Sequence, residues 1–340
     1  MVDVLMVSLG ATGGLRMADD ELYYSFKRLN VSVAVARPFR PEDVPTMMLT
    51  DLLWAHATRA SAKDMIAQLH RYPARAVIYS STTAALFWPR AGAIRFDAPA
   101  AGNRPGRHGL WQRPLERRRL RQAPLLLPWS EAGLQEAPDV ARDGDRALVL
   151  PVPVEPSGPP DPDRDIDAIT YAANPSKKGL DRVLSAWRSV RLPSEELVIV
   201  GASADNLDRA GISVPGEEEG ITILGPMPSP HYRALLRRAR VFVCAPRRED
   251  YGIAQLEALA DGCQLVTTPA PGPYVALALA RALDPRLVDE DLGAGLRSAL
   301  DAPTPDYAAR AAEMIAPFTR EAVDRLIADE MLPRLFADAS

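Results

Sequence analysis

The chain has few of the residues that build metal centres and disulfide frameworks. Its 340 residues include two cysteines, Cys244 and Cys263, and four histidines. Neither cysteine belongs to a CxxC motif, and the histidines are scattered along the chain. We therefore expect a reduced setting, with no disulfide and no His-based metal site.

Long apolar runs and a strong charge of one sign are also missing. No stretch approaches the roughly 18–20 apolar residues that span a bilayer. The opening residues, MVDVLMVSLGATGG, have the character of a first strand rather than a signal peptide. The net charge is −4, whereas a nucleic-acid-binding domain is usually far more basic. These features predict a cytoplasmic protein without a nucleic-acid partner.

Lysine is scarce as well, because arginine supplies most of the 40 basic residues. The four lysines are Lys27, Lys63, Lys177 and Lys178, so two of the four are adjacent. One interpretation of the adjacent pair is a solvated helix start. In a chain that uses arginine almost everywhere, the pair favours a functional role for Lys177 and Lys178.

Proline is concentrated near the middle of the chain, where residues 151–163 include six prolines. Proline fixes φ and removes a backbone donor, so this stretch predicts an extended linker and not a packed element. A chain of this length is also expected to form two domains. We predict an N-terminal Rossmann-like domain at 1–150, a linker at 151–165 and a C-terminal Rossmann-like domain at 166–315. A C-terminal helix at 316–340, with a break at Pro317, could pack back on the N-terminal domain.

Short apolar strands alternate with helical patterns, most clearly in the second half. This alternation predicts an α/β fold with parallel sheets, whose ligands bind beyond the carboxyl ends of the strands. The predicted strands of the second half are 168–172, 197–200, 221–224, 241–244 and 265–268. Those of the first half are 4–9, 31–36, 76–79, 94–96 and 125–127, with a helix at 17–29.

The stretch from Glu249 to Glu257 carries the strongest functional signal. An apolar strand at 241–244 is followed by the polar turn RREDYG and by a helix from Ile253. Backbone N–H groups at the start of such a helix form an anion site. A diphosphate there would have one carboxylate on each side, one for sugar hydroxyls and one for a ribose diol. The alternative is that both glutamates are ordinary exposed residues.

The run EDYGIAQLEALADG resembles the E-x7-E signature of retaining glycosyltransferases of the GT-B fold, especially family 4. Asp250 stands where glycine is commoner. Three further segments resemble the same family: NPSKKGLDRVLSAW, LVIVGAS and ILGPMPSPHYRALLRRARVFVCAP. The positions that match the signature are Glu249, Tyr251, Gly252, Glu257, Ala258 and Gly262.

The resemblance implies a GT-B architecture, with two Rossmann-like domains facing each other across a cleft. It implies a hexosyltransferase-type enzyme that uses a nucleotide-sugar donor, retains the anomeric configuration and needs no cofactor or obligatory metal. Glu249 would hold the donor sugar, Glu257 the ribose, and Lys178 the diphosphate as charge develops on it. The other donor-binding positions implied are Lys177, Tyr251, Gly252, Ile253, and Gly225 and Met227 in the loop around the base.

One departure from the family concerns the diphosphate. The family usually has an arginine about six residues before the lysine, and this chain has Ala172 there. Our hypothesis is that Arg247 or Arg248 supplies the missing charge, since both adjoin Glu249. The alternative is weak catalysis.

The first half is expected to supply the acceptor side. Gly13 and Gly14 follow the first strand and resemble the family's glycine turn near the donor phosphate and acceptor. A rival interpretation is a dinucleotide site, with Arg37 in the place of an NADP-type arginine. Asp97 stands where relatives carry a histidine, and is either a polar group near the reacting carbon or a turn residue before Pro99.

The region Arg104–Arg121 is rich in arginine and includes Trp111. It indicates a phosphorylated acceptor site, a weak contact with anionic lipid headgroups at the inner face of the membrane, or a solvated helix face. The acceptor itself, a glycan, a lipid-linked sugar or a small molecule, is not specified. Two other functional hypotheses are a nucleotide-sugar epimerase or hydrolase, and a degenerate member that partners a catalytic glycosyltransferase.

Overall fold

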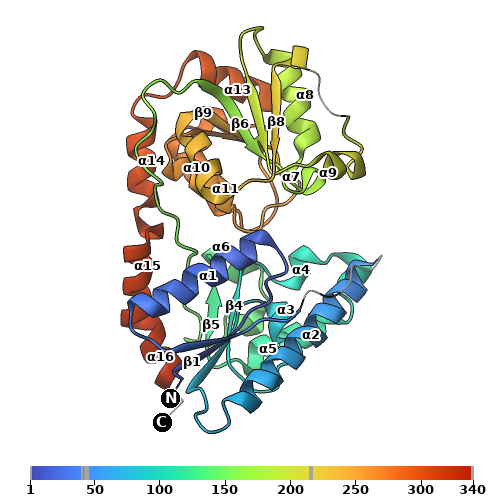
Figure 1. The fold of residues 1–340 in the computed structure, drawn as a ribbon, viewed down its shortest axis with the longest axis vertical. Coiled ribbons are helices and arrows are strands. Elements are labelled where there is room, and N and C mark those ends of the chain that lie inside the picture. The colour runs from blue at the N-terminus through green and yellow to red at the C-terminus, as the bar shows by residue number, and fades with distance from the viewer. Residues whose placement is uncertain (1, 40, 42–45, 214–216, 338–340) are drawn as a thin grey trace. The chain divides into compact units, whose positions relative to one another are not determined.

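The computed structural model describes residues 2–39, 41, 46–213 and 217–337. The chain forms two compact units (Figure 1). Unit 1 comprises Met1–Pro153 and Arg320–Ser340, and unit 2 comprises Val154–Thr319. Each unit has a five-stranded parallel sheet with helices packed on it, which confirms the predicted α/β fold class.

The sheet of unit 1 has the strand order β2-β1-β3-β4-β5. Its strands are β1 (Val4–Val7), β2 (Val33–Ala36), β3 (Ala76–Tyr79), β4 (Ala93–Phe96) and β5 (Leu126–Pro128). Its helices are α1 (Gly13–Arg28), α2 (Met47–Gln68), α3 (Thr82–Ala85), α4 (Ala100–Asn103), α5 (Gln112–Gln122), α6 (Glu131–Glu136), α15 (Arg320–Leu326) and α16 (Leu332–Ala337).

Alternation along β1 divides the core of unit 1 between the two faces of the sheet. Leu5 and Val7 pack in one cluster with residues of α2, α3 and α5. Val4 and Met6 pack in the other with residues of α1, α15 and α16. A period of two residues is what a strand buried on both faces requires.

The C-terminal segment belongs to unit 1, although it is last in sequence. Arg28 Nε lies 2.5 Å from Asp324 Oδ2, and Arg320 pairs with Glu21 at 2.8 Å, so two ion pairs join α1 to α15. The side chains of Val323 and Ile327 are fully or almost fully buried against the sheet. A short turn at Ala316–Phe318, which contains Pro317, precedes this segment.

The sheet of unit 2 has the order β10-β9-β6-β7-β8. Its strands are β6 (Ile166–Tyr171), β7 (Leu197–Val200), β8 (Ile221–Gly225), β9 (Ala239–Cys244) and β10 (Gln264–Thr267). Its helices are α7 (Pro175–Lys178), α8 (Leu180–Val190), α9 (Ala204–Arg209), α10 (Ser229–Arg238), α11 (Ile253–Ala260), α12 (Val275–Leu283), α13 (Leu292–Asp301) and α14 (Tyr307–Ile315).

All ten predicted strands are present, with bounds that differ by at most two residues. The helix predicted at 17–29 begins four residues earlier, because the Thr12 hydroxyl caps it by accepting the Leu15 N–H. Helix α2 was not predicted from the sequence. Its apolar residues are spread around the helix, so the pattern lacks the apolar stripe that marks an amphipathic helix.

The proline-rich segment is extended, as predicted, but it is packed rather than free. The Ser157 N–H donates to Asp261 Oδ1 at 2.8 Å, and Arg233 donates to the Glu155 carbonyl at 2.6 Å. Val154 is also buried. The expectation of an unpacked spacer is therefore wrong, because polar groups of α10 and of the residue after α11 bind its backbone.

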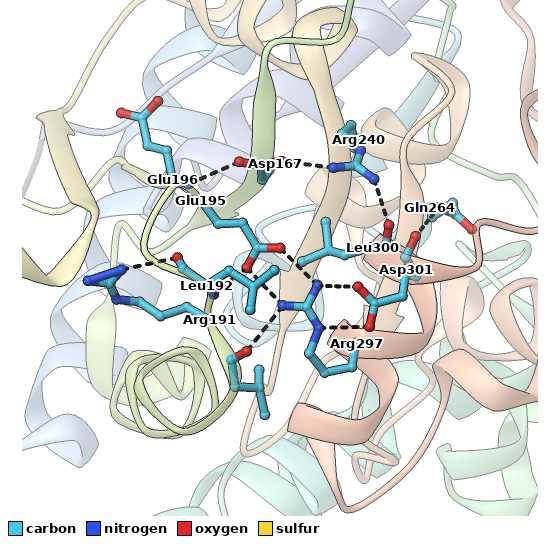
Figure 2. Close-up of polar contacts among 12 residues, drawn as sticks. Asp167, Arg191, Leu192, Glu195, Glu196, Arg240, Gln264, Arg297, Leu300 and Asp301 are labelled. Atoms are coloured by element: carbon cyan, nitrogen blue, oxygen red, sulfur yellow. Dashed lines mark hydrogen bonds and ion pairs between the residues drawn. The ribbon is translucent and has the colours of Figure 1, made fainter.

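Charged side chains tie the amino ends of the unit 2 strands together (Figure 2). Arg297 of α13 pairs with Glu195, before β7, at 2.8 Å and with Asp301 at 2.7 Å. Arg240 of β9 pairs with Asp167 of β6, also at 2.8 Å. Ligands of parallel sheets bind at the opposite, carboxyl edge, so this network is suited to stability.

Candidate functional site

The carboxyl ends of β6 and β9 bring two predicted segments together. These strands are adjacent and parallel, so the loops that follow them leave the sheet side by side. Gly179 has φ +65°, and a Cβ there would lie 1.9 Å from the Ala245 carbonyl oxygen. The Arg247 N–H donates to the Lys177 carbonyl at 3.1 Å. Only glycine permits this approach, which seats the lysine pair against the turn before α11.

Glu249 and Lys178 form the centre of the site. Lys178 Nζ lies 2.5 Å from Glu249 Oε2, and Gln255 Nε2 donates to the same oxygen at 3.2 Å. Glu249 is only 6% exposed. A carboxylate this buried needs such partners. The role of Gln255 was not predicted from the sequence.

A second pair of charges lies beside the first. Asp250 accepts from Lys177 Nζ at 3.1 Å and from Arg248 Nε at 2.8 Å. Arg247 instead pairs with Asp181 on α8 at 2.8 Å. Of the two arginines proposed to replace the one missing at position 172, Arg248 shares the Asp250 carboxylate with Lys177, whereas the Arg247 guanidinium is held by Asp181 and by the Ser176 carbonyl.

The start of α11 is shaped by glycine. Gly252 has φ +94°, and a Cβ there would meet the Tyr274 ring at 2.8 Å. Tyr251 is 2% exposed, and its carbonyl accepts the Val275 N–H at 3.2 Å. Ile253 then begins the helix. Three cationic side chains, two carboxylates and a helix N-terminus thus lie at one edge of the sheet, an arrangement that favours an anion.

Glu257 is buried rather than exposed, so the interpretation of it as a surface helix residue is wrong. Its carboxylate lies 3.5 Å from Arg233 Nη1, while Arg233 makes a bidentate pair with Asp261 at 2.6 and 2.9 Å. Burial raises the pKa of Glu257 to about 7, Arg233 opposes that rise and Asp261 adds to it. This carboxyl group therefore titrates near neutral pH.

Two tyrosines near Glu257 were not singled out from the sequence. The rings of Tyr171, at the end of β6, and Tyr232 of α10 have centroids 5.3 Å apart. The Glu257 charge contributes to the raised pKa of both tyrosines, with burial the larger cause. A tyrosine fits the apolar pattern of a strand or helix and so does not stand out in the sequence. The grouping of these two rings is visible only in the tertiary structure.

The predicted base loop follows β8. Gly225 ends that strand with φ +67°, and the nearest atom to a Cβ there would be the Ala202 carbonyl oxygen at 3.8 Å. Met227 is half-buried. Ala172 is 1% exposed and donates its N–H to the Val200 carbonyl, so the position where the family has arginine lies directly after β6 and is bonded to the end of β7.

The remaining predicted residues lie in unit 1. Gly13 and Gly14 open α1 and are exposed. Asp97 follows β4, and its Oδ1 accepts the Ala98 N–H at 2.7 Å. Beyond Asp97, the carboxylate of Glu116, 1% exposed, accepts the Ala100 N–H. Burial raises the pKa of Glu116 to about 7, and the Asp97 charge adds to this.

The arginine-rich region is divided between structural and exposed side chains. Arg104 pairs with Asp51 of α2 at 2.5 Å, and Arg119 lies over the Trp88 ring at 4.9 Å. The exposed arginines are Arg107, Arg117, Arg118 and Arg121. The other three of the seven arginines in this region, Arg104, Arg113 and Arg119, therefore contact neighbouring groups within unit 1.

A family model described as "Glycosyl transferases group 1" matches residues 167–292. Residues 167–292 form a group 1 glycosyltransferase domain. The matched range contains every charged residue of the cluster around Glu249 and Glu257. This domain and the GT-B fold support the expectation of a hexosyltransferase-type enzyme. No curated protein sequence matches the chain.

Solved structures similar to the whole chain are GT-B glycosyltransferases. Sucrose-phosphate synthase from Thermosynechococcus elongatus has a TM-score of 0.75 and 15% identity, covering 99% of this chain and 100% of that one. Anabaena HepE in complex with UDP has a TM-score of 0.66 and 13% identity, covering 97% and 99%. An E. coli trehalose-6-phosphate protein bound with UDP-2-fluoro glucose has a TM-score of 0.65 and 12% identity, and the match covers 98% of this chain and 99% of that one. These likenesses establish the GT-B fold of the chain.

Among the residues that the structure describes, no group of three or more His, Cys, Asp or Glu side chains could hold a metal ion. None of the helices formed by the described residues is both long and apolar enough to cross a membrane.

Proposed function

We propose that this chain transfers a hexosyl group from a nucleotide sugar to an acceptor hydroxyl. The observation that carries the proposal is the pairing of Lys178 with Glu249 at the carboxyl edge of the unit 2 sheet, with Glu257 buried in the helix that follows. A cation poised for the diphosphate and a carboxylate poised for sugar hydroxyls then share one site. The UDP and UDP-sugar named with two structures of the same fold add support.

The donor would lie across the start of α11. Lys178 neutralises the diphosphate as the bond between the sugar and its phosphate oxygen breaks. Arg248 supplies the charge that the arginine missing at Ala172 would otherwise give. Glu249 accepts hydrogen bonds from sugar hydroxyls, and Glu257 accepts them from the ribose diol. Tyr251, Gly252, Ile253, Gly225 and Met227 complete the donor site.

The reaction we propose retains the anomeric configuration, as in family 4. The acceptor oxygen attacks the anomeric carbon from the face that the diphosphate leaves. Its proton passes to a leaving phosphate oxygen, so no carboxylate nucleophile is needed. The cations at the site balance the charge without an obligatory metal. Asp97, Gly13 and Gly14 serve the acceptor side.

Nucleotide binding and product analysis test this proposal. The melting temperature should rise with one of UDP, GDP, ADP or dTDP, since ligands that bind the native state stabilise it. The ligand should no longer raise the melting temperature of the Lys178→Ala variant, whereas it should still raise that of the matched control variant Lys63→Ala on α2. NMR of the product then reports the anomer. If no nucleoside diphosphate or nucleotide sugar raises the melting temperature, the proposal is wrong.

Arg247 and Arg248 provide an internal comparison for the replacement of the missing arginine. Arg248→Ala should reduce transfer about as much as Lys178→Ala, whereas Arg247→Ala should have a small effect because that guanidinium pairs with Asp181. Normal activity of the double alanine variant would refute the replacement.

A weak contact with the inner face of an anionic membrane is a further part of the proposal, and it implies a cytoplasmic protein. The exposed arginines of α5 and of the turn before it carry the charge. Sedimentation with vesicles that contain phosphatidylserine should fall when Arg117, Arg118 and Arg121 are changed to glutamine. Equal binding to neutral vesicles would contradict it.

A further inference from the structure

A pocket of about 720 Å³ lies in unit 1, and the proposed donor site does not use it. Its lining comes from α1, from the residues at and after the end of β2, and from α2. Its volume falls within the range of small-molecule sites, roughly 300–1,000 Å³. The carboxyl end of a parallel strand is also where such sheets hold ligands.

The pocket lies along the free edge of the sheet, because β2 is an edge strand. The Ser32 and Ala36 carbonyls accept N–H groups from the β1 side. Since neighbouring residues of a strand point their backbone groups to opposite sides, those of Val35 face the free edge. Val35 lines the pocket, so the edge offers a ligand a backbone donor and acceptor.

Three aromatic side chains line the pocket: Tyr23, Tyr24 and Phe39. Tyr23 and Tyr24 meet edge to face with centroids 5.4 Å apart, and Lys27 Nζ lies over the Tyr23 ring at 5.7 Å. Tyr24 is 57% exposed and Phe39 is 97% exposed. Large rings left in water at a concave site are typical of ligand contact. The negative face of an aromatic ring suits the C–H face of a sugar.

The polar lining is acidic on balance. Arg37, the one cation among the described lining residues, forms an ion pair with Asp20. Asp64 of α2 adds a second carboxylate, and Ser61 and Gln68 add neutral hydrogen-bonding groups. The pairing of Arg37 also argues against the NADP interpretation, which needs that guanidinium for a phosphate. The lining therefore favours hydroxyl groups, or an amine, over an anion.

We propose that this pocket binds a pyranose ring of an uncharged or amino sugar and that this ring belongs to the acceptor. The second part rests on the proposed transfer function, whereas the binding itself does not. Tyr24 and Phe39 contact the apolar face of the ring. Asp64, Gln68 and the Val35 backbone bind its hydroxyls.

Methyl NMR of the full chain labelled at methionine tests the proposal. Met65 lines the pocket, Met227 lies in the predicted base loop, and Met331 is buried on the other face of the unit 1 sheet. Methyl glycosides of glucose, galactose, mannose and N-acetylglucosamine, and glucosamine, are titrated separately. We expect at least one of them to shift Met65 saturably, to leave Met331 unchanged, and to exceed the effect of glucose 6-phosphate.

Two substitutions and a control link the shift to the pocket. Tyr24→Ala and Asp64→Asn should each weaken the sugar about fivefold, which is the order of one aromatic contact or hydrogen bond. The control is Tyr72→Ala, which also removes an exposed tyrosine ring. It should leave the affinity for the sugar unchanged, because Tyr72 lies outside the pocket lining. Unchanged affinity in both pocket variants would overturn the proposal.

The donor signal keeps the two proposals separable. If UDP shifts Met227 while no sugar shifts Met65, the pocket proposal fails and the transferase proposal stands. If a sugar shifts Met65 while no nucleotide shifts Met227, the pocket stands and the donor proposal fails. A response of Met65 to glucose 6-phosphate that exceeds that of every uncharged or amino sugar would make this an anion site and overturn the proposal.

Discussion

Lys178 Nζ lies 2.5 Å from Glu249 Oε2, joining two residues that are 71 positions apart in the sequence. Neither element alone would hold this pair. The lysine follows β6 and the glutamate follows β9, and the parallel pairing of those strands brings their carboxyl ends together. The pair is the feature from which donor binding and catalysis can be tested most directly.

Lys178→Ala should lower kcat/KM about 10²–10³-fold, the usual effect of losing one group that stabilises developing charge. Lys177→Ala should cost less, because Lys177 is half-exposed and contacts Asp250 rather than Glu249. Steady-state rates with the donor found by thermal shift provide the measurement. Equal losses for the two lysines would contradict the distinct role of Lys178.

Glu257 should make donor affinity depend on pH. An ionised carboxylate accepts hydrogen bonds from the ribose diol more strongly than a protonated one does, and the pKa of Glu257 is about 7. Affinity should therefore rise up to about tenfold from pH 6 to pH 8, as the ionised fraction increases. Calorimetric titration with UDP measures this.

Comparison with 2′,3′-dideoxy-UDP isolates the contribution of the ribose, since both ligands share the same diphosphate titration. The ratio of the two affinities should grow with pH in the parent and stay flat in Glu257→Gln. A ratio independent of pH in the parent would assign the ribose to another group.

Glu116 should make unit 1 less stable as pH rises. Its pKa is about 7 in the folded chain and near 4.5 in a free side chain. Between these values the native state binds more protons than the unfolded state. The contribution of Glu116 to the free energy of unfolding is therefore fully present below pH 4.5 and is lost as pH rises to 7. The loss amounts to about 3 kcal/mol.

Glu116→Gln removes this titration while keeping an acceptor for the Ala100 N–H. The melting temperature of the variant, relative to the parent, should therefore increase from pH 5 to pH 8. Glu313→Gln, an exposed glutamate on α14, serves as the control and should show no such trend. A constant difference for Glu116→Gln would show that the carboxyl group is ionised throughout.

Arg297→Ala should destabilise unit 2 without changing nucleotide binding. The change leaves Glu195, 9% exposed, without its guanidinium partner, at a cost of about 2 kcal/mol. Since this network lies at the amino ends of the strands, the dissociation constant for UDP should stay within about twofold of the parent. Urea unfolding and calorimetry measure the two quantities, and a large loss of UDP affinity would contradict the separation.

The local spacing of apolar residues was sufficient to predict most strands of the fold. Each strand of unit 2 contains a short run of mostly apolar residues, so its place could be predicted from neighbours in the sequence. Helix α2 was not predicted because its apolar residues do not lie on a single face of the helix. The packing of the proline-rich segment was not predicted because it depends on Asp261 and Arg233, which lie more than 75 residues further along the chain.

The strand–turn–helix around Glu249 follows from the amino-acid sequence alone, since glycine, proline and apolar spacing act over a few residues. The sequence also determined the resemblance to the glycosyltransferase family, which residues 167–292 bear out. Which charged side chains meet depends on the tertiary structure. It joined Lys178 to Glu249, sent Arg247 to Asp181 and Arg248 to Asp250, and buried Glu257 beside Arg233. Electrostatic energies fall with distance through space, and the order of residues in the chain does not give that distance.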